Sequence, residues 1–262
     1  MKKIGSVIFC ALSICLIALA GNALAYNAAY THTTYYTASV FPTINGQYTM
    51  GDEWLASGTT TFGTNGIFRS EWGMPANVFQ YLLVETADNT DDAGDYFELC
   101  FDGNADGGTA PQTDDYRVTV TGHGASQVVQ WYAGNGMAWV AIPARANTPL
   151  ATSLSSSPKI AAAHYILELA IDKQGTDVPL GMNWALRVAY NDAHAGGAGL
   201  QAWPPAPGAT RDAPAGWGYV PYEFAANPTP DVPEGISLGI MAALSSIALV
   251  AATVYLKKRD KA

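Results

Sequence analysis

The clearest fold signal in the sequence is Tyr96-Phe97-Glu98-Leu99-Cys100-Phe101, which runs into the turn Asp102-Gly103-Asn104-Ala105-Asp106-Gly107-Gly108. A period of two places Phe97, Leu99 and Phe101 on one face of an extended strand. The glycine, asparagine and aspartate residues that follow are typical of a tight turn. The stretch therefore predicts a strand with one buried face, closed by an acidic turn.

The same alternation returns along the chain between residues 26 and 235. It is clear in 116–120, 165–171 and 184–190, and shorter apolar runs occupy 79–84, 128–132 and 139–142. No long amphipathic helix is evident before residue 236, whereas residues 147–159 are typical of a surface loop and residues 202–221 of an ordered, proline-rich coil. Short strands divided by turns predict an all-β fold, an antiparallel β-sandwich of jelly-roll type, over residues 40–222 after an N-terminal extension at 26–39.

The first residues have the features of a secretory signal. Met1-Lys2-Lys3 is basic, residues 4–20 are almost entirely apolar, and Ala23 and Ala25 supply the small residues of a cleavage site. We expect a signal peptide at residues 1–25 and a mature chain that begins at Tyr26. The alternative is an uncleaved N-terminal anchor helix.

The other end predicts a membrane span. Residues 236–256 carry no charge, which suits a transmembrane helix, and Lys257, Lys258, Arg259 and Lys261 follow in a basic tail at 257–262. Since basic residues stay on the cytoplasmic side, the sandwich is expected outside the cell membrane above a proline-rich stalk at 223–235. The lipid bilayer is then a partner through residues 236–256.

Charge argues against a nucleic-acid-binding protein, and cysteine content argues against a fold held together by disulfides. The chain has a formal charge of −9, and residues 26–235 hold seven basic and 21 acidic side chains, a balance of −14. Such a field repels nucleic acid and favours cations, although it also serves simply to keep a surface soluble. Once Cys10 and Cys15 leave with the signal, Cys100 stands alone and no intramolecular disulfide can form.

The acidic turn is a candidate metal site. Oxygen-bearing side chains at Asp102, Asn104 and Asp106 can wrap a hard cation such as Ca²⁺, and Asp114 or Asp115 could complete its shell. The loop is not an EF-hand, because Thr113 occupies the position of the bidentate glutamate. The alternative is a turn without an ion. A second acidic stretch at residues 88–95 is interpreted as a solvated loop.

Aromatic residues suggest a ligand surface. Sugar rings stack on aromatic planes, and their hydroxyls need polar partners beside those planes. The tryptophans in or beside turns are the candidates for exposure and ligand contact, and they are Trp72, Trp131, Trp203 and Trp217. No spacing typical of a zinc enzyme, a nucleophile elbow or a phosphate loop is present, so we expect a binding protein and not an enzyme.

Several motifs together resemble the family 9 carbohydrate-binding modules. They are Pro42-Thr43-Ile44-Asn45-Gly46, Gly51-Asp52-Glu53-Trp54, Tyr81-Leu82-Leu83-Val84, the 95–102 strand, Asn183–Asp192 and Trp203-Pro204-Pro205 with Trp217-Gly218. The resemblance covers roughly residues 40–220. It implies a β-sandwich that often carries structural calcium, here at Asp102, Asn104 and Asp106, and that binds a glycan or cell-envelope polysaccharide between aromatic side chains.

The tail and the histidines leave alternatives open. Val232-Pro233-Glu234-Gly235 with the following span resembles archaeal surface-protein tails, although Gly235 replaces the phenylalanine of the usual sorting signal. The leading interpretation is a surface module that binds carbohydrate. The alternatives are a structural envelope protein and a haem-b-binding electron-transfer domain that uses Met50, Met74, Met137 or Met182 with His123, His164 or His194.

Overall fold

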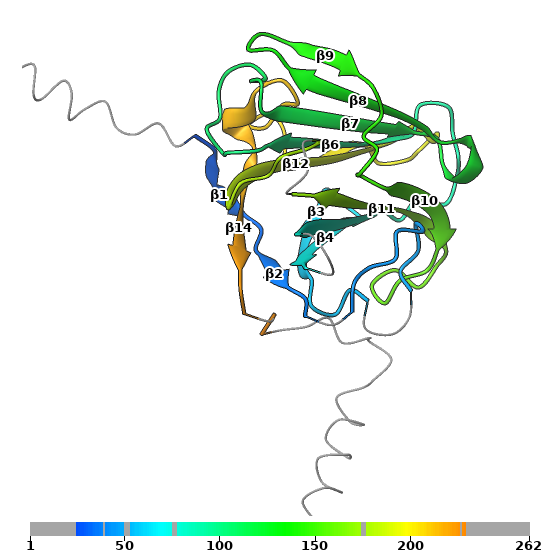
Figure 1. The fold of residues 1–262 in the computed structure, drawn as a ribbon. Helices are drawn as coiled ribbons and strands as arrows, with labels where there is room; N and C mark the ends of the chain where they lie inside the picture. The colour runs from blue at the N-terminus through cyan, green and yellow to red at the C-terminus, as the bar shows by residue number, and fades with distance from the viewer. Residues whose placement is uncertain are drawn as a thin grey trace, which may run out of the picture.

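The chain folds almost entirely into strands (Figure 1). The computed structural model describes residues 25–38, 40–49, 53–74, 78–173, 177–225 and 227–228. Within them the strands are β1 (Asn27–Thr31), β2 (Thr34–Tyr36), β3 (Gly58–Phe62), β4 (Gly66–Gly73), β5 (Phe79–Glu85), β6 (Tyr96–Asp102), β7 (Asp115–Thr121), β8 (Val128–Gly134), β9 (Trp139–Ile142), β10 (Leu150–Ser155), β11 (His164–Asp172), β12 (Asn183–Asp192), β13 (Gly199–Trp203) and β14 (Gly218–Glu223). Two short 3-10 helices, η1 (Gly124–Ser126) and η2 (Pro214–Gly216), complete the described elements.

The described strands form one mixed sheet that curls into two layers. The main path runs β10-β11-β5-β4-β2-β14-β12-β6-β7-β8-β9, with β1, β13 and β3 paired beside it. We name the part around β12, β6, β7, β8 and β9 the β6 layer, and the part around β10, β11, β5, β4 and β3 the β5 layer. Strand β14 pairs with β12 through its first residues and with β2 through its last, so it joins the two layers, as the left side of Figure 1 shows.

The main core lies between the two layers. The predicted inward residues of β6 and β11 are all fully buried there, namely Phe97, Leu99, Phe101, Leu167, Leu169 and Ile171. Trp184 from β12, expected in the core from its alternation with Leu186 and Val188, is also fully buried. The period of two therefore predicted correctly which face of these strands is apolar.

The outer face of the β5 layer is closed by residues 40–49 and 53–57, which we name the strap. Trp54 and Tyr48 of the strap form a second apolar cluster with the outward side chains of β5 and β11. The Glu168 carboxylate of β11 accepts hydrogen bonds from the Asn45 and Gly46 amides, both at 2.9 Å, and from Trp54 Nε1 at 2.9 Å. Buried amides need acceptors, so this one carboxylate fixes the strap on the sheet.

Gly46 is required by this close approach. Its φ is +76°, and a Cβ at this position would lie 2.5 Å from the Ser153 backbone nitrogen of β10. Only glycine allows both the left-handed conformation and this contact. The Ile44-Asn45-Gly46 motif and its distant tryptophan are thus explained by the docking of the strap.

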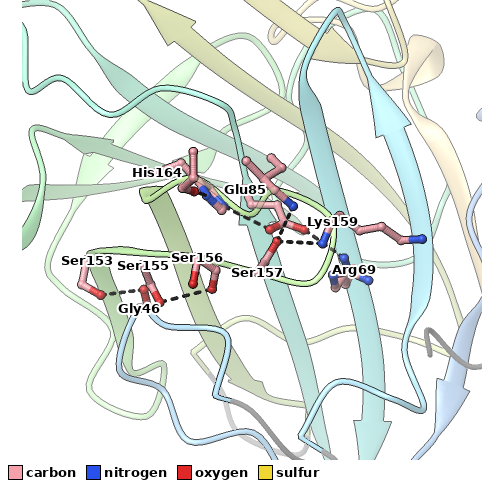
Figure 2. A network of polar contacts seen from close by, with 11 residues as sticks. Gly46, Arg69, Glu85, Ser153, Ser155, Ser156, Ser157, Lys159 and His164 are labelled. Atoms are coloured by element: carbon pink, nitrogen blue, oxygen red, sulfur yellow. Dashed lines mark hydrogen bonds and ion pairs between the residues drawn. The ribbon is translucent and has the colours of Figure 1, made fainter. Parts of the chain in front are cut away.

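Beside the strap, the same face holds a buried polar network (Figure 2). Glu85 of β5 pairs with Arg69 of β4 at 2.9 Å and with His164 of β11 at 3.1 Å. All three side chains are at most 1% exposed. Figure 2 shows Ser157 and Lys159 on the same network, so the segment after β10 also covers this layer.

Some sequence predictions are corrected by the structure. The sheet is mixed and not purely antiparallel, because β1 with β14, β14 with β2, and β2 with β4 are parallel pairs. The predicted surface loop at 147–159 contains strand β10, and the extension predicted at 26–39 supplies strands β1 and β2. Both segments lack strong alternation because they sit at sheet edges or bridge the layers.

The terminal predictions lie mainly outside the described residues. The signal peptide falls at residues 1–25 and the span at 236–256, and neither is described apart from Ala25. Across the part of the chain that the structure describes, we find no helix with the length and apolar character needed to cross a membrane.

Replacing Glu168 tests the strap. In Glu168→Gln one acceptor oxygen becomes a donor amide, so at least one of the three N–H groups loses its partner. We expect a loss of about 2–4 kcal/mol in the free energy of unfolding, measured by denaturant titration. The control is Asp212→Asn, which alters an exposed carboxylate that pairs with Arg211. It should change the free energy of unfolding by less than about 1 kcal/mol. Equal stability of both variants would contradict the role of Glu168.

Candidate functional site

The outer face of the β6 layer carries a row of polar and aromatic side chains. Cross-strand register sets Arg187 of β12 opposite Cys100, Cys100 opposite Arg117 of β7, and Arg117 opposite Tyr132 of β8. We name the polar-aromatic face by its six residues: Tyr96, Glu98, Arg117, Tyr132, Trp139 and Arg187. They alternate with the core residues of the same strands, so the apolar inner face and this polar outer face arise from one pattern.

Glu98 is the centre of this face. Its Oε1 accepts a hydrogen bond from Arg187 Nη1 at 2.6 Å, and its Oε2 lies 4.0 Å from Arg117 Nη1. The three side chains are at most 8% exposed. A buried ion pair is costly to desolvate and is poor evidence for stability alone.

The two guanidinium groups have spare hydrogen-bonding capacity. The Nε atoms of Arg117 and Arg187 are buried and have no hydrogen-bond partner within the protein. Buried donors of this kind are normally satisfied.

Aromatic rings flank the ion pairs. The Arg117 guanidinium carbon lies 3.8 Å from the centroid of the Tyr132 ring and 5.3 Å from that of Trp139. The Trp139 indole is held on one side by Trp217, in a parallel arrangement at 6.3 Å, and its Nε1 donates to the Arg211 carbonyl at 3.2 Å. Both Tyr132 and Trp139 are partly exposed, so they combine ring surface with charged neighbours.

The four tryptophans expected at the surface are buried. Trp72, Trp131, Trp203 and Trp217 have exposed fractions between 0% and 5%. Trp131 faces the core opposite Val118, Trp203 packs on Phe68, Trp72 donates to the Glu223 carbonyl, and Trp217 donates to the Thr210 carbonyl. The expectation of exposure was wrong, because proximity to a turn does not reveal which side of the sheet a ring occupies.

Sequence reasoning missed most of the polar-aromatic face. A usable signal was present, since Glu98, Arg117 and Arg187 each interrupt an apolar strand at an outward position. A charge on the outward face of a strand usually means solvent, so the pattern could not show that the three charges meet. The pairing of β6 with β7 and with β12 brings the three charged side chains together.

Three residues of the predicted cation site come together at the turn that connects β6 to β7. Asp102 ends β6, Asp115 begins β7, and each of these two and Asp114 offers a carboxylate oxygen within 4.8 Å of the others. Asp114 Oδ2 and Asp115 Oδ1 are buried without a partner. Carboxylates with free oxygens fit a hard cation such as Ca²⁺.

The remaining two predicted ligands lie at the rim of this carboxylate cluster. Asn104 and Asp106 are exposed, and Asn104 Oδ1 accepts the Asp106 amide at 2.7 Å while Asn104 Nδ2 donates to Asp106 Oδ2 at 3.1 Å. Asp102 Oδ2 accepts the Gly107 amide at 2.8 Å, which folds the turn over its carboxylate. The turn thus behaves as an Asx-rich loop that orients Asp102.

Burial and mutual repulsion shift the titration of the carboxylate cluster. Burial, with further contributions from Asp106 and Asp114, raises the pKa of Asp102 to about 6. Burial and the charges of Asp102 and Asp114 raise the pKa of Asp115 to about 8. Both shifts mean that the ionised cluster is destabilising unless a cation neutralises it.

The acidic loop at residues 88–95 lies at the opposite end of the same hairpin. Carboxylate oxygens of Asp88 and Asp95 lie within 4.8 Å of a ring nitrogen of His123, which follows β7. Asn191 Nδ2 donates to the Gly94 carbonyl at 2.9 Å, so the end of β12 approaches this loop. The interpretation of 88–95 as a solvated loop therefore holds only in part, because Asp88 and Asp95 are buried.

The residues named for a haem site lie in different surroundings. His164 is engaged by Glu85 and the Ala162 carbonyl, and His194 is an exposed partner of Asp92. Met74, Met137 and Met182 are exposed by 53%, 80% and 55%, whereas Met50 lies outside the described residues. Met74, Met137 and Met182 are exposed, and His164 and His194 are already bonded within the protein, so these residues do not form a haem pocket.

Comparison with known proteins supports the fold class. No family model and no curated protein matches this chain. Two solved structures of a family 9 carbohydrate-binding module from Caldicellulosiruptor kristjanssonii are similar in fold. The one in complex with cellotriose has a TM-score of 0.52 and 18% identity, covering 78% of this chain and 98% of that module. The one in complex with glucose has a TM-score of 0.50 and 18% identity, covering 74% and 97%. The chain thus has the fold of a family 9 carbohydrate-binding module.

The carboxylate cluster predicts a specific pH dependence. Because the pKa of Asp115 is raised in the fold, the stability of the ion-free protein is greatest below pH 4 as far as this group is concerned and falls as the pH rises through about 8. Asp115→Asn should flatten this decline in the melting temperature measured in EDTA between pH 5 and 9. A decline that is unchanged in the variant would contradict the assignment.

Proposed function

We propose that this protein is a non-enzymatic module that binds carbohydrate through the polar-aromatic face of its β6 layer. The observation that carries the proposal is the juxtaposition of partly exposed Tyr132 and Trp139 with the Glu98 ion pairs. Ring planes provide stacking surface for the C–H faces of a sugar, and the charged groups provide directional partners for its hydroxyls.

The rest of the fold supports this choice of face. In the β5 layer the strap covers the outward side chains of β5 and β11. The similar solved modules are in complex with cellotriose and with glucose, and this likeness in fold makes β-glucan oligosaccharides the first ligands to test.

We further propose that calcium occupies the carboxylate cluster and stabilises the turn after β6. Asp102, Asp114 and Asp115 would hold the ion, with Asp106 at the rim. The role would be structural, because the cluster shares strands β6 and β7 with Glu98 and Arg117 and so braces the hairpin that carries the polar-aromatic face.

The cellular placement follows from the sequence and is part of the proposal. A signal at residues 1–25 and an anchor at 236–256 would display the module on the outside of the cell membrane. In that position it would meet either environmental glycan or the polysaccharide of the cell's own envelope.

Aromatic substitutions test the glycan proposal. Tyr132→Ala and Trp139→Ala should each weaken binding of a glycan found on an array by at least about tenfold, or ~1.4 kcal/mol, in isothermal titration calorimetry. Phe224→Ala is the matched control, since Phe224 is 63% exposed and packs beside Trp72 on another part of the surface. Its affinity should equal that of the wild type.

The same experiment separates the structural alternative. If the wild-type chain binds no glycan on the array but self-associates in a calcium-dependent way, a structural envelope role replaces the present proposal. If glycan binding survives both aromatic substitutions, the binding surface lies elsewhere.

Stability in calcium gives an independent test of the ion. Added Ca²⁺ should raise the melting temperature of the wild-type chain at pH 8, because the ion binds the folded state and offsets the repulsion in the carboxylate cluster. Asp115→Asn should weaken the binding of Ca²⁺ by at least about tenfold, or ~1.4 kcal/mol. A melting temperature that is the same in EDTA and in added Ca²⁺ would exclude a structural calcium ion.

A further inference from the structure

His123 is a buried imidazole without a hydrogen-bond partner. The side chain follows β7 and is only 3% exposed, and neither Nδ1 nor Nε2 has a partner in the protein. Its ring is stacked on that of Tyr165 at 3.6 Å with an interplanar angle of 9°, and it forms a T-shaped pair with the Phe97 ring at 5.7 Å. Buried histidine nitrogens are ordinarily bonded, so this one requires a reason.

Two carboxylates face this imidazole. Oxygens of Asp88 and Asp95 and one ring nitrogen of His123 all lie within 4.8 Å of one another. In a tetrahedral zinc site such donors are roughly 3.3–3.5 Å apart, a separation that small side-chain rotations can reach.

The carboxylates are already oriented by other donors. Asp88 Oδ1 accepts from the Thr90 amide at 2.9 Å and the Thr90 hydroxyl at 2.8 Å, and its Oδ2 accepts from the Tyr190 hydroxyl. Asp95 accepts from the Asp92 amide and the Ala193 amide, both at 2.7 Å. Supporting hydrogen bonds of this kind fix metal ligands in place.

The backbone of His123 is also held. Its carbonyl accepts from the Ser126 hydroxyl at 2.7 Å and the Ser126 amide at 3.1 Å, which closes the short helix η1. The Gly124 amide donates to Thr152 Oγ1 of β10 at 2.8 Å. The ring is therefore positioned by packing and backbone contacts, while its nitrogens stay unused.

We propose that Asp88, Asp95 and His123 form a second metal site, which takes a borderline divalent transition-metal ion such as Zn²⁺. One imidazole nitrogen with two carboxylate oxygens is a ligand set for zinc-like ions, whereas Ca²⁺ takes oxygen ligands alone. The site differs from the carboxylate cluster in place as well as chemistry, because the seven residues of β6 separate the two by roughly 20 Å. The bound ion would join the 88–95 loop to the end of β7, and three protein ligands leave a position for water.

Zinc titration of the full-length chain tests this site. The purified protein is stripped with EDTA and saturated with Ca²⁺, so that the carboxylate cluster is occupied, and ZnCl₂ is added in a calorimeter. We expect one Zn²⁺ to bind per chain, and His123→Gln should weaken the affinity for Zn²⁺ by at least about 100-fold. The matched control is His194→Gln, which removes an exposed histidine that pairs with Asp92 on the same loop and should leave affinity within about threefold.

A second readout avoids dependence on the folding of the variant. X-ray absorption of the zinc-loaded wild-type chain should show one imidazole nitrogen and a remaining shell of oxygen. Three results would overturn the proposal: no Zn²⁺ uptake in saturating Ca²⁺, loss of uptake in His194→Gln, or an all-oxygen shell around the zinc. Failure of glycan binding would not affect this test, since the measurement needs no sugar.

Discussion

The carboxylate of Glu168 decides which of the two layers keeps an uncovered outer face for the proposed ligand, because it holds the strap on the β5 layer. It accepts hydrogen bonds from three N–H groups of residues that lie more than 110 positions earlier in the chain, and so it fastens the strap over the β5 layer. Burial raises the pKa of Glu168 to about 7, and the three donors oppose that shift. Because the strap occupies this face, the proposed glycan surface is placed on the outward face of the β6 layer.

The β6–β7 hairpin concentrates the chemistry of the domain. Its centre carries Glu98 and Arg117, one end carries the carboxylate cluster, and the other end adjoins Asp95 and His123. Strands buried on one side are rigid supports, and groups placed on them keep their geometry better than groups on loops. A single hairpin can therefore align the proposed glycan surface with ions at both of its ends.

The strength of periodicity decided what the sequence could predict. The inward residues of β6, β11 and β12 followed from alternation alone. The meeting of Asp102 with Asp114 and Asp115 was predicted only within a wider set that also named Asn104 and Asp106, which lie at the rim. The parallel pairs of β2 and the meeting of Glu98 with Arg187 depend on long-range pairing, which a local pattern does not contain. The prediction of a coil at 202–221 was wrong at both ends, because Trp203 ends β13 and β14 begins directly after Trp217; the burial of both rings depends on these long-range pairings.

The central claim is that glycan binds over Tyr132 and Trp139, above the Glu98 ion pairs. A crystal structure of the protein with a bound β-glucan oligosaccharide tests this most directly. The account predicts a sugar ring stacked on Tyr132 or Trp139, with hydroxyls bonded to Arg117 or Arg187. A sugar bound against the strap, or at any surface that leaves these four side chains untouched, would contradict it.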